Sequence, residues 1–376
     1  MKTPTVFYDY HLPREKIAQQ PSQRRDASRL LVVHRSSGEI EHRIFRSITE
    51  YLQEGDLLVV NDTRVFPARM FFRKQTGARI EILFLRRCDS DMNGKTSGIP
   101  KTSLGVAHHK NGELWQVLAR PGKRLKLGIC LVSEKSKKTK IIVEGKDEEE
   151  GTYWIRLLSP YDTESLFEKY GSVPLPPYVH KPLRSRERYQ TVYAAAAGST
   201  AAPTAGLHFT PALMKKIRSI GCQFATITLH IGPATFRPIR SEFAEDHPMH
   251  PEWYSIPQKA VDAIINTKER GGRVIAVGTT SVRTLETWGL DSGLRIQDSG
   301  KSLISRPDPK FTNLYITEGF QFRVVDALVT NFHLPRSTLL ILVSAFCGRE
   351  LLLKAYGEAI KRDYRFYSFG DAMLII

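Results

Sequence analysis

Three histidines lie at the predicted ends of structural elements, where a side chain reaches a cleft most readily. His208 follows a run of small residues, His230 ends a predicted strand, and His333 stands between a predicted strand and Pro335. Histidine titrates near neutral pH and often acts as general acid or base. A single histidine of this kind is more often a buried or capping residue. Three of them at element ends indicate that at least one lines a cleft.

The sequence Val-Gly-Thr-Thr-Ser at 277–281 follows an apolar run and precedes a helical pattern. At such a strand-to-helix junction, free backbone N–H groups at the helix N-terminus bind anions or polar ligands. The spacing is neither G-x-G-x-x-G nor a Walker A loop, so it identifies neither a dinucleotide nor a triphosphate site. Taken alone, such a junction is structural more often than it is a binding site.

Two further segments combine charged groups with turn residues. Asn61-Asp62-Thr63-Arg64 ends a predicted strand and offers an amide, a carboxylate and a guanidinium, although an Asp-capped turn has the same composition. Near the C-terminus, Tyr364–Asp371 surrounds Arg365 with aromatic residues. Aromatic and arginine side chains stack on nucleic-acid bases, and they are equally common in a strand at a sheet edge.

Metal chemistry is not predicted. His247 and His250, with Glu252, lack the helical H-E-x-x-H spacing, and the prolines between and after the histidines disfavour a helix. The four cysteines are far apart without C-x-x-C pairing, which is typical of reduced thiols in the cytosol.

Composition restricts the class of protein. The 376 residues include 55 Lys+Arg and 39 Asp+Glu, a net charge of +16. The pI near 9.7 is as compatible with a polyanionic partner (RNA, DNA or anionic lipid) as with a merely solvated basic surface. No apolar run approaches the ~20 residues of a membrane span, and the N-terminus lacks the layout of a secretory signal. We therefore expect a cytoplasmic protein without a membrane partner, and nothing in the sequence demands an oligomer, so a monomer is expected.

Residues 56–158 read as a small β-barrel or sandwich. Short Val-, Ile- and Leu-rich runs alternate there with Gly-, Ser-, Asn- and Lys-rich segments, without a helical period. The polar stretch from Cys88 to Gly112 is expected to be an exposed loop. The predicted strands are 56–61, 78–85, 114–119, 129–133, 140–143 and 153–158.

After residue 205 the pattern changes to alternating helices and strands, which predicts a mostly parallel α/β sheet covered on both faces. The expected helices are 211–220, 258–270, 281–288 and a stretch over 337–362, and the expected strands are 224–231, 273–277, 314–317 and 327–331. Residues 1–55 contain one more strand, 29–34. We therefore predict an α/β domain formed by 1–55 and 159–376, with 56–158 inserted.

The segment AAAAGSTAAPTAG at 194–206 has the composition of a flexible linker. The alternative is an ordered loop in which small side chains let the backbone approach a ligand. The apolar residues that flank His208 favour the ordered loop.

Eight sequence blocks, in order and along essentially the whole chain, resemble one family, the S-adenosylmethionine:tRNA ribosyltransferase-isomerases of queuosine biosynthesis. The blocks are Asn61–Arg69, Pro174–Tyr178, Tyr189–Tyr193, Ala202–Phe209, Thr228–Gly232, Gly278–Arg283, Thr330–Pro335 and Tyr364–Leu374.

The resemblance implies a three-layer α/β domain with an inserted all-β barrel. It also implies a tRNA substrate with 7-aminomethyl-7-deazaguanine at the wobble position of the anticodon loop. The ribosyl moiety of S-adenosylmethionine is transferred onto this base and isomerised, which gives epoxyqueuosine-tRNA and releases adenine and methionine. S-adenosylmethionine is thus a consumed co-substrate, and neither a cofactor nor a metal is implied.

This chemistry needs a base for the acidic carbon beside the sulfonium and a proton donor for the departing adenine. We expect His208 and His333 to transfer protons, and Asp62 or Asp371 to hold the cationic amine or the sulfonium. Residues of the small-residue loop and of the 278–281 junction are expected to shape the nucleoside and methionine pockets, and arginines to meet phosphates or a base face. These predicted substrate contacts are Thr204, Gly206, Gly278, Thr279, Thr280, Asn331, Arg64, Arg69, Arg283 and Arg365.

Two other classes remain open at this point. An RNA methyltransferase would share the donor and the partner, but a Rossmann-type Gly-rich loop with a downstream acidic residue is not seen. A non-catalytic RNA-binding protein would account for the charge. Polar residues such as His208 and Asn331 amid apolar runs argue against it.

Overall fold

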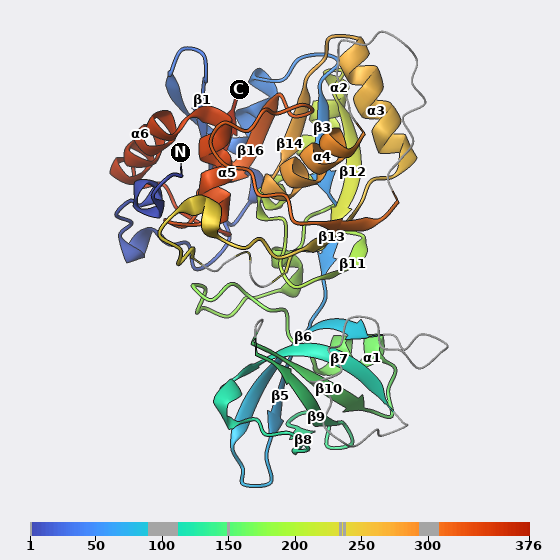
Figure 1. Ribbon diagram of the computed structural model, residues 1–376. Coiled ribbons are helices and arrows are strands. Elements are labelled where there is room, and N and C mark those ends of the chain that lie inside the picture. Colours follow the sequence, from blue (N-terminus) through green and yellow to red (C-terminus); the bar gives the residue numbers. More distant parts are fainter. Residues whose placement is uncertain (1, 89–111, 149–150, 233–234, 236–237, 293–307) are drawn as a thin grey trace. The chain divides into compact units, whose positions relative to one another are not determined.

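The computed structural model describes residues 2–88, 112–148, 151–232, 235, 238–292 and 308–376, and these form two compact units (Figure 1). The first unit contains the chain up to Arg64 together with Leu175–Ile376, and the second is formed by Val65–Pro174. Most of the stretch predicted as an exposed loop, 89–111, lies outside the described residues.

The first unit is built on a nine-stranded sheet with the order β15-β13-β12-β3-β14-β16-β17-β1-β2. In that order the strands are Lys310–Thr312, Glu252–Ser255, Gln223–Leu229, Leu57–Asn61, Val274–Val277, Ala327–Asn331, Ala372–Ile375, Arg29–Val33 and Ile40–Ile44.

Strand directions make the sheet mixed. Strands β12, β3, β14 and β16 run parallel, whereas β17 is antiparallel to β16. Strand β1 is parallel to β17. Strand β2 pairs antiparallel with β1, and β13 pairs antiparallel with both β12 and the outermost strand β15. The predicted parallel sheet is therefore confined to four central strands, because C-terminal strand β17 returns in the opposite direction.

Helices cover both faces of this sheet, as predicted. On one face, Leu58 and Val60 pack with α2 (Pro211–Ser219) and the 3₁₀ helix η4 (Phe45–Glu50). On the other, Leu57 and Val59 belong to the core formed with the remaining four helices. These are α3 (Gln258–Glu269), α4 (Thr279–Asp291), α5 (Thr338–Cys347) and α6 (Arg349–Lys361). The alternation follows from the two-residue period of a strand.

Local signals account for the helix ends. The Thr210 hydroxyl accepts a hydrogen bond from the Leu213 N–H at 3.1 Å, and Pro211 occupies the first helical position of α2. The stretch predicted over 337–362 divides into α5 and α6 at Gly348, whose φ of +87° interrupts the helix.

The second unit is a closed antiparallel barrel with the order β10-β7-β6-β5-β8-β9. Its strands are β5 (Arg69–Arg73), β6 (Arg79–Cys88), β7 (Glu113–Arg120), β8 (Cys130–Ser133), β9 (Lys140–Asp147) and β10 (Thr152–Leu158). Helix α1 (Thr163–Tyr170) begins at Asp162, whose carboxylate accepts from the Ser165 N–H. The expected fold class, a three-layer α/β domain with an inserted barrel, is confirmed.

The predicted barrel boundaries differ from the observed unit. The strand predicted at 56–61 is β3, which pairs with β12 and β14 in the centre of the sheet of the first unit. Strand β5, which the sequence prediction omitted, takes its place in the barrel, and the unit extends to Pro174 because α1 packs its Leu166 and Phe167 into the barrel core. The strand predicted at 314–317 is wrong, because the strand lies at Lys310–Thr312.

The small-residue segment is ordered. It contains β11 (Ala196–Ser199), which pairs with β4 (Thr63–Val65), and the 3₁₀ helix η7 (Thr204–His208). Ser199 is buried and donates to the carbonyl of Ala201. Further 3₁₀ helices with described bounds are η1 (Thr5–Tyr8), η2 (Arg14–Lys16), η3 (Arg25–Ala27), η5 (Gly122–Arg124), η6 (Arg186–Tyr189) and η9 (Ala244–Asp246).

Candidate active site

One edge of the sheet in the first unit gathers polar residues from distant parts of the chain. Asn61, Gly278 and Asn331 stand at the carboxyl ends of the parallel strands β3, β14 and β16. Asp371 precedes β17, which runs in the opposite direction, and Ser28 precedes β1, which is parallel to β17. All five residues therefore reach the same edge, which is where open α/β sheets bind ligands.

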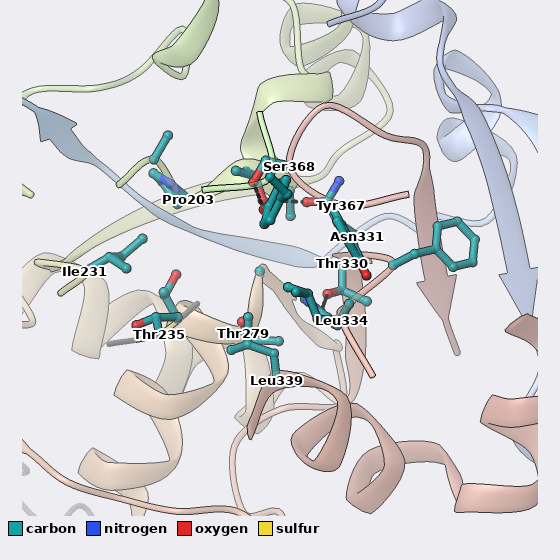
Figure 2. Close-up of a pocket in the computed structure, with 18 residues that line it drawn as sticks. Pro203, Ile231, Thr235, Thr279, Thr330, Asn331, Leu334, Leu339, Tyr367 and Ser368 are labelled. Atoms are coloured by element: carbon teal, nitrogen blue, oxygen red, sulfur yellow. Dashed lines mark hydrogen bonds between the residues drawn. The ribbon is translucent and has the colours of Figure 1, made fainter. Parts of the chain in front are cut away.

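A pocket opens at this edge, with about 560 Å³ of empty space including its solvent-open part. In the view of Figure 2, Asn331, Tyr367 and Ser368 lie on one side of it, and Thr279 and Leu339 on the other. Six of the predicted site residues line the pocket: Thr204, Gly278, Thr279, Thr280, Asn331 and His333.

Asn331 connects the pocket to His208 behind it. Its Nδ2 lies 3.0 Å from Nε2 of His208, and its Oδ1 accepts from the Thr204 hydroxyl at 2.8 Å. On the other side of the ring, His208 Nδ1 lies 2.7 Å from the hydroxyl of Ser28, which donates to the Arg25 carbonyl. An amide donor at Nε2 assigns the proton to Nδ1, which donates to Ser28. Both ring nitrogens of His208 are therefore engaged within the protein.

His333 lines the pocket and has a different environment. Its Nε2 shares a hydrogen bond with the Thr330 hydroxyl at 2.8 Å, and its backbone N–H donates to the Tyr356 hydroxyl. The Tyr10 hydroxyl donates to its carbonyl. Within the part of the chain that the structure describes, its Nδ1 has no hydrogen-bond partner. The imidazole is thus fixed by the protein at one nitrogen and available to a ligand at the other.

Burial keeps both histidines neutral near pH 7. It lowers the pKa of His333 to about 3. It also lowers the pKa of His208 to about 4, where Asp371 acts in the opposite direction and Arg365 and Arg25 in the same direction. Removal of water disfavours the charged imidazolium more strongly than one carboxylate favours it.

The N-terminus of α4 forms one wall of the pocket. Gly278 has a φ of +91°, a conformation that favours glycine, and it joins β14 to the helix. The N–H groups of Thr279 and Thr280 have no acceptor among the described residues, whereas Ser281 bonds to the Gly278 carbonyl. Free N–H groups at a helix start attract an anionic ligand group.

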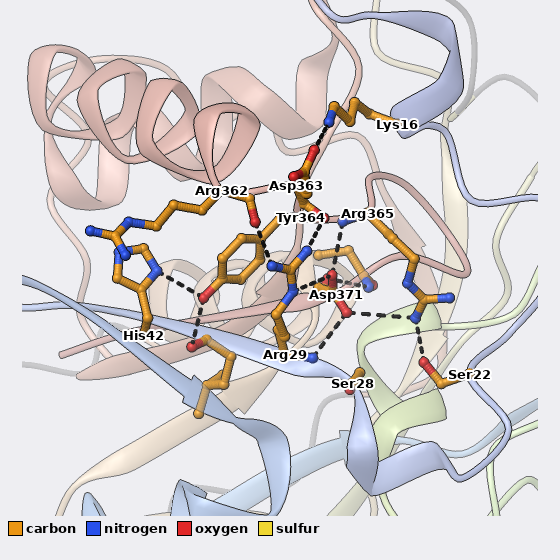
Figure 3. Close-up of polar contacts among 12 residues, drawn as sticks. Lys16, Ser22, Ser28, Arg29, His42, Arg362, Asp363, Tyr364, Arg365 and Asp371 are labelled. Carbon is orange, nitrogen blue, oxygen red and sulfur yellow. Dashed lines mark hydrogen bonds and ion pairs between the residues drawn. The ribbon is translucent and has the colours of Figure 1, made fainter.

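Asp371 is buried behind the pocket and does not line it. Its carboxylate accepts from the backbone N–H groups of Arg29 at 2.9 Å and Arg365 at 2.8 Å (Figure 3). The guanidinium groups of the same two arginines lie 3.5 Å from it, and the Arg365 guanidinium also donates to Ser22. In this structure the carboxylate is thus fully engaged in joining the start of β1 to the turn before β17, and its predicted contact with a substrate cation stays a prediction.

Asp62 also lies outside the pocket lining. Its carboxylate accepts from the Thr228 hydroxyl at 2.7 Å, and burial raises its pKa. Arg64 forms an exposed ion pair with Glu187 at 2.7 Å. The predicted substrate contacts of Asp62 and Arg64 remain untested predictions.

Three further predicted residues have structural environments of their own. Arg283 is buried in an ion pair with Glu252, the residue set aside as a metal ligand. Arg69 belongs to the barrel unit, where it pairs with Glu81. Gly206 lies behind the pocket, and a Cβ there would stand 2.0 Å from the Tyr193 hydroxyl oxygen, so the position requires glycine.

Several pocket residues were missed by the sequence analysis. Tyr178 and Ser368 line the pocket and share a hydrogen bond at 2.6 Å. Thr330 positions His333, and Ser28 positions His208. Tyr178, Ser368 and Thr330 all lie within the sequence blocks that carry the family resemblance. Their position in these blocks could have identified them as site residues. Ser28 has no such signal.

Among the described residues, no group of three or more His, Cys, Asp or Glu side chains is arranged to hold a metal ion. The same part of the chain contains no helix that is long and apolar enough to span a membrane.

Comparisons with known proteins agree with the geometry. A family model described as "Queuosine biosynthesis protein" matches residues 5–375. The S-adenosylmethionine:tRNA ribosyltransferase-isomerases of Thermotoga maritima and Desulforamulus reducens are 48% and 45% identical, each match covering 98% of this chain and 98% of the relative. The crystal structure of S-adenosylmethionine tRNA ribosyltransferase from Thermotoga maritima is 39% identical, covers 98% of this chain and 100% of that one, and gives a TM-score of 0.50. As its sequence blocks predicted, this chain belongs to the queuosine biosynthesis family of S-adenosylmethionine:tRNA ribosyltransferase-isomerases.

Proposed function

We propose that this chain transfers and isomerises the ribosyl moiety of S-adenosylmethionine onto 7-aminomethyl-7-deazaguanine at the wobble position of tRNA. The products are epoxyqueuosine-tRNA, adenine and methionine. The observation that carries the proposal is the family match over residues 5–375, and the composition of the pocket at the sheet edge supports it.

The pocket suits S-adenosylmethionine. The N–H groups at the start of α4 match the carboxylate of its methionine part, and this negative charge is favoured by the helix dipole. The apolar side chains of Ile231, Leu334 and Leu339 match its methylene groups and purine ring. Hydroxyl and amide groups of Thr204 and Asn331 match the ribose hydroxyls.

We assign proton transfer to His333 and positioning to His208. His333 lines the pocket as a neutral imidazole, which is the form that accepts the proton from the carbon next to the sulfonium. His208, expected from sequence to share this task, donates from Nδ1 to Ser28 and accepts from Asn331 at Nε2. It therefore acts through the orientation of the Asn331 amide.

The net charge of +16 suits a tRNA partner. We propose that the protein contacts the anticodon loop, where single-stranded bases can be turned out and stacked on protein groups. We further propose that it acts in the cytoplasm as a monomer, which light scattering of the purified chain tests.

Product analysis tests the proposed reaction. Purified protein is incubated with S-adenosylmethionine and tRNA that carries the aminomethyl-deazaguanine base, and adenine and methionine are expected in equal amounts. Release of S-adenosylhomocysteine would instead identify a methyltransferase. tRNA binding without any small-molecule product would identify a non-catalytic RNA-binding protein.

A pair of variants tests the residue assignment. His333→Gln is expected to lower kcat on the order of 100-fold or more while tRNA affinity is retained, as for loss of a general base. His208→Gln is expected to cost less, because its effect passes through Asn331. Equal losses in the two variants would contradict the different roles.

A further inference from the structure

A second hollow of the first unit lies outside the pocket and is walled by arginines. It forms where β2, the outermost strand on its side of the sheet, meets the end of α6, and its empty space is about 930 Å³ including open solvent. We call it the arginine hollow. It is lined by Arg29, His42, Arg43, Ile44, Arg46, Ser47, Arg362 and Tyr364.

The positive charge of the arginine hollow is only partly balanced. Arg43 pairs with Glu41, whose carboxylate also accepts from His34 and Tyr51. Arg362 lies 3.6 Å from a Glu358 carboxylate oxygen. The Arg29 guanidinium lies 3.5 Å from the buried carboxylate of Asp371. None of these three acids lines the hollow, and none of its lining residues in the described part of the chain is acidic.

The other two arginines of the hollow, Arg46 and Arg29, differ in how firmly they are held. Arg46 is exposed and has no ion-pair or hydrogen-bond partner among the described residues. Arg29 is held firmly: its guanidinium carbon lies 4.1 Å from the centroid of the Tyr364 ring, and it donates to the carbonyls of Arg362 and Asp363 (Figure 3). A fixed guanidinium with an exposed, unpartnered one in the same hollow is suited to phosphate oxygens, which arginine binds in a forked geometry.

The pKa of His42 depends on the charges in the arginine hollow. Its Nδ1 lies 3.0 Å from the Tyr364 hydroxyl oxygen. Burial, followed by the charges of Arg362, Arg29 and Arg43, lowers its pKa, and Glu358 acts in the opposite direction. An anion bound among these arginines would oppose their effect and raise the pKa of His42.

The location of the arginine hollow selects an RNA as the source of the anion. Arg29 begins β1 and pairs in register with Ile44 at the end of β2. The hollow therefore lies at the same edge of the sheet as the pocket, although the two share no lining residue. A polyanion bound at the pocket therefore meets these arginines at the same edge. Charged residues on an outermost strand such as β2 can also serve only to prevent pairing with another chain, and arginines with that role need no ligand.

We propose that the arginine hollow binds the phosphodiester backbone of the tRNA outside the reacting nucleotide. This inference rests on the proposed function for the identity of the RNA. The contact fixes the position of the tRNA and reads no base, as backbone contacts generally do.

Salt-dependent binding of tRNA tests the proposal. Each phosphate contact contributes ~0.7 to the slope of log affinity against log salt. The double variant Arg43→Gln/Arg46→Gln loses two such contacts, so its slope is expected to be shallower by about 1.4. This corresponds to a loss on the order of tenfold in affinity at 0.15 M salt, with kcat at saturating tRNA unchanged. The matched control is Lys216→Gln/Arg270→Gln, which removes the same charge near the ends of α2 and α3, at the opposite edge of the sheet.

The NMR titration of His42 gives a second readout. Its pKa is expected to rise when tRNA is added, and the rise should be absent in the Arg43→Gln/Arg46→Gln variant. Inorganic phosphate is the comparison probe. A shift with inorganic phosphate but none with tRNA would assign the hollow to a free anion and overturn the RNA assignment.

Equal salt slopes in the two double variants would also overturn the proposal, because the arginines would then act through net charge alone. This failure is separable from a failure of the proposed function. If the wild-type chain turns over but the two double variants have equal salt slopes, only the proposal for the arginine hollow is wrong. If tRNA binding depends on the hollow but adenine and methionine are not released, only the proposed reaction is wrong. No binding of tRNA by the wild-type chain would remove both.

Discussion

At the scale of single residues, the two buried histidines of the site differ in whether a ring nitrogen is left free for a substrate. Thr204 donates to Asn331, Asn331 donates to His208, and His208 donates to Ser28, so each of the three hydrogen bonds has one donor and one acceptor. Such a chain holds the Asn331 amide in one orientation, because reversing it would place two donors or two acceptors together. His333 is fixed only through its Nε2, so its free nitrogen makes it the better candidate for direct chemistry.

The burial of His333 predicts a dependence of stability on pH. Its pKa is about 3 in the folded protein and about 6.5 in an unfolded chain, so the unfolded state binds more protons between these values. The free energy of unfolding should therefore fall as the pH falls below about 6.5. His333→Gln should make the loss between pH 7 and pH 5 smaller by about 2 kcal/mol, measured by urea unfolding at both pH values.

The exposed His11 provides the control, since His11→Gln should retain the full wild-type difference. Retention of that difference in His333→Gln would show that His333 is already solvated in the folded state.

At the scale of elements, the junction between β14 and α4 determines the shape of the pocket wall. The backbone must turn from the strand into the helix within one residue, and Gly278 does so with a positive φ. A Cβ at this position would stand 3.6 Å from the Cβ of Ala205, so space is available and the conformation is the main obstacle. The helix start and the small-residue loop thus approach each other across the pocket.

Gly278→Ala is predicted to lower the free energy of unfolding by about 1–2 kcal/mol, because L-residues disfavour this backbone conformation. It should also raise KM for S-adenosylmethionine, since relief of the strain moves the N–H groups of Thr279 and Thr280.

Gly348→Ala is the matched control for this effect. Gly348 has a similar φ of +87° between α5 and α6, with nothing within 4 Å of an added Cβ. It should lose similar stability with KM unchanged. A similar rise of KM in both variants would mean that the junction does not shape the binding site.

At the scale of the whole molecule, the proposed function assigns the net charge and the pocket to two different ligands. The excess of basic residues acts over distance and attracts a polyanion. The pocket in the first unit is lined mainly by hydroxyl, amide and apolar groups, and in the described part of the chain no Lys or Arg lines it. We therefore predict that attraction of the RNA and binding of the small co-substrate are separable.

Kinetics over a range of salt concentrations check this separation. The KM for tRNA should rise steeply with salt, because each phosphate contact releases counterions. The KM for S-adenosylmethionine should change little between 50 and 200 mM salt, on the order of twofold at most, because its binding releases few counterions. Parallel increases of both values would indicate that salt acts on the active site itself.

The sequence by itself determined the features that depend on neighbouring residues. The cap at Thr210, the helix over 258–269 and the strand-to-helix junction at Gly278 are each specified within a few residues, and six predicted site residues line one pocket. The tertiary structure alone decided which distant groups neutralise one another. Strand β3 was predicted in the barrel but lies in the central sheet, because strand pairing depends on partners far along the chain. The carboxylate of Asp371 and the guanidinium of Arg283 look available in sequence, and only the fold supplies the N–H groups and the carboxylate that engage them.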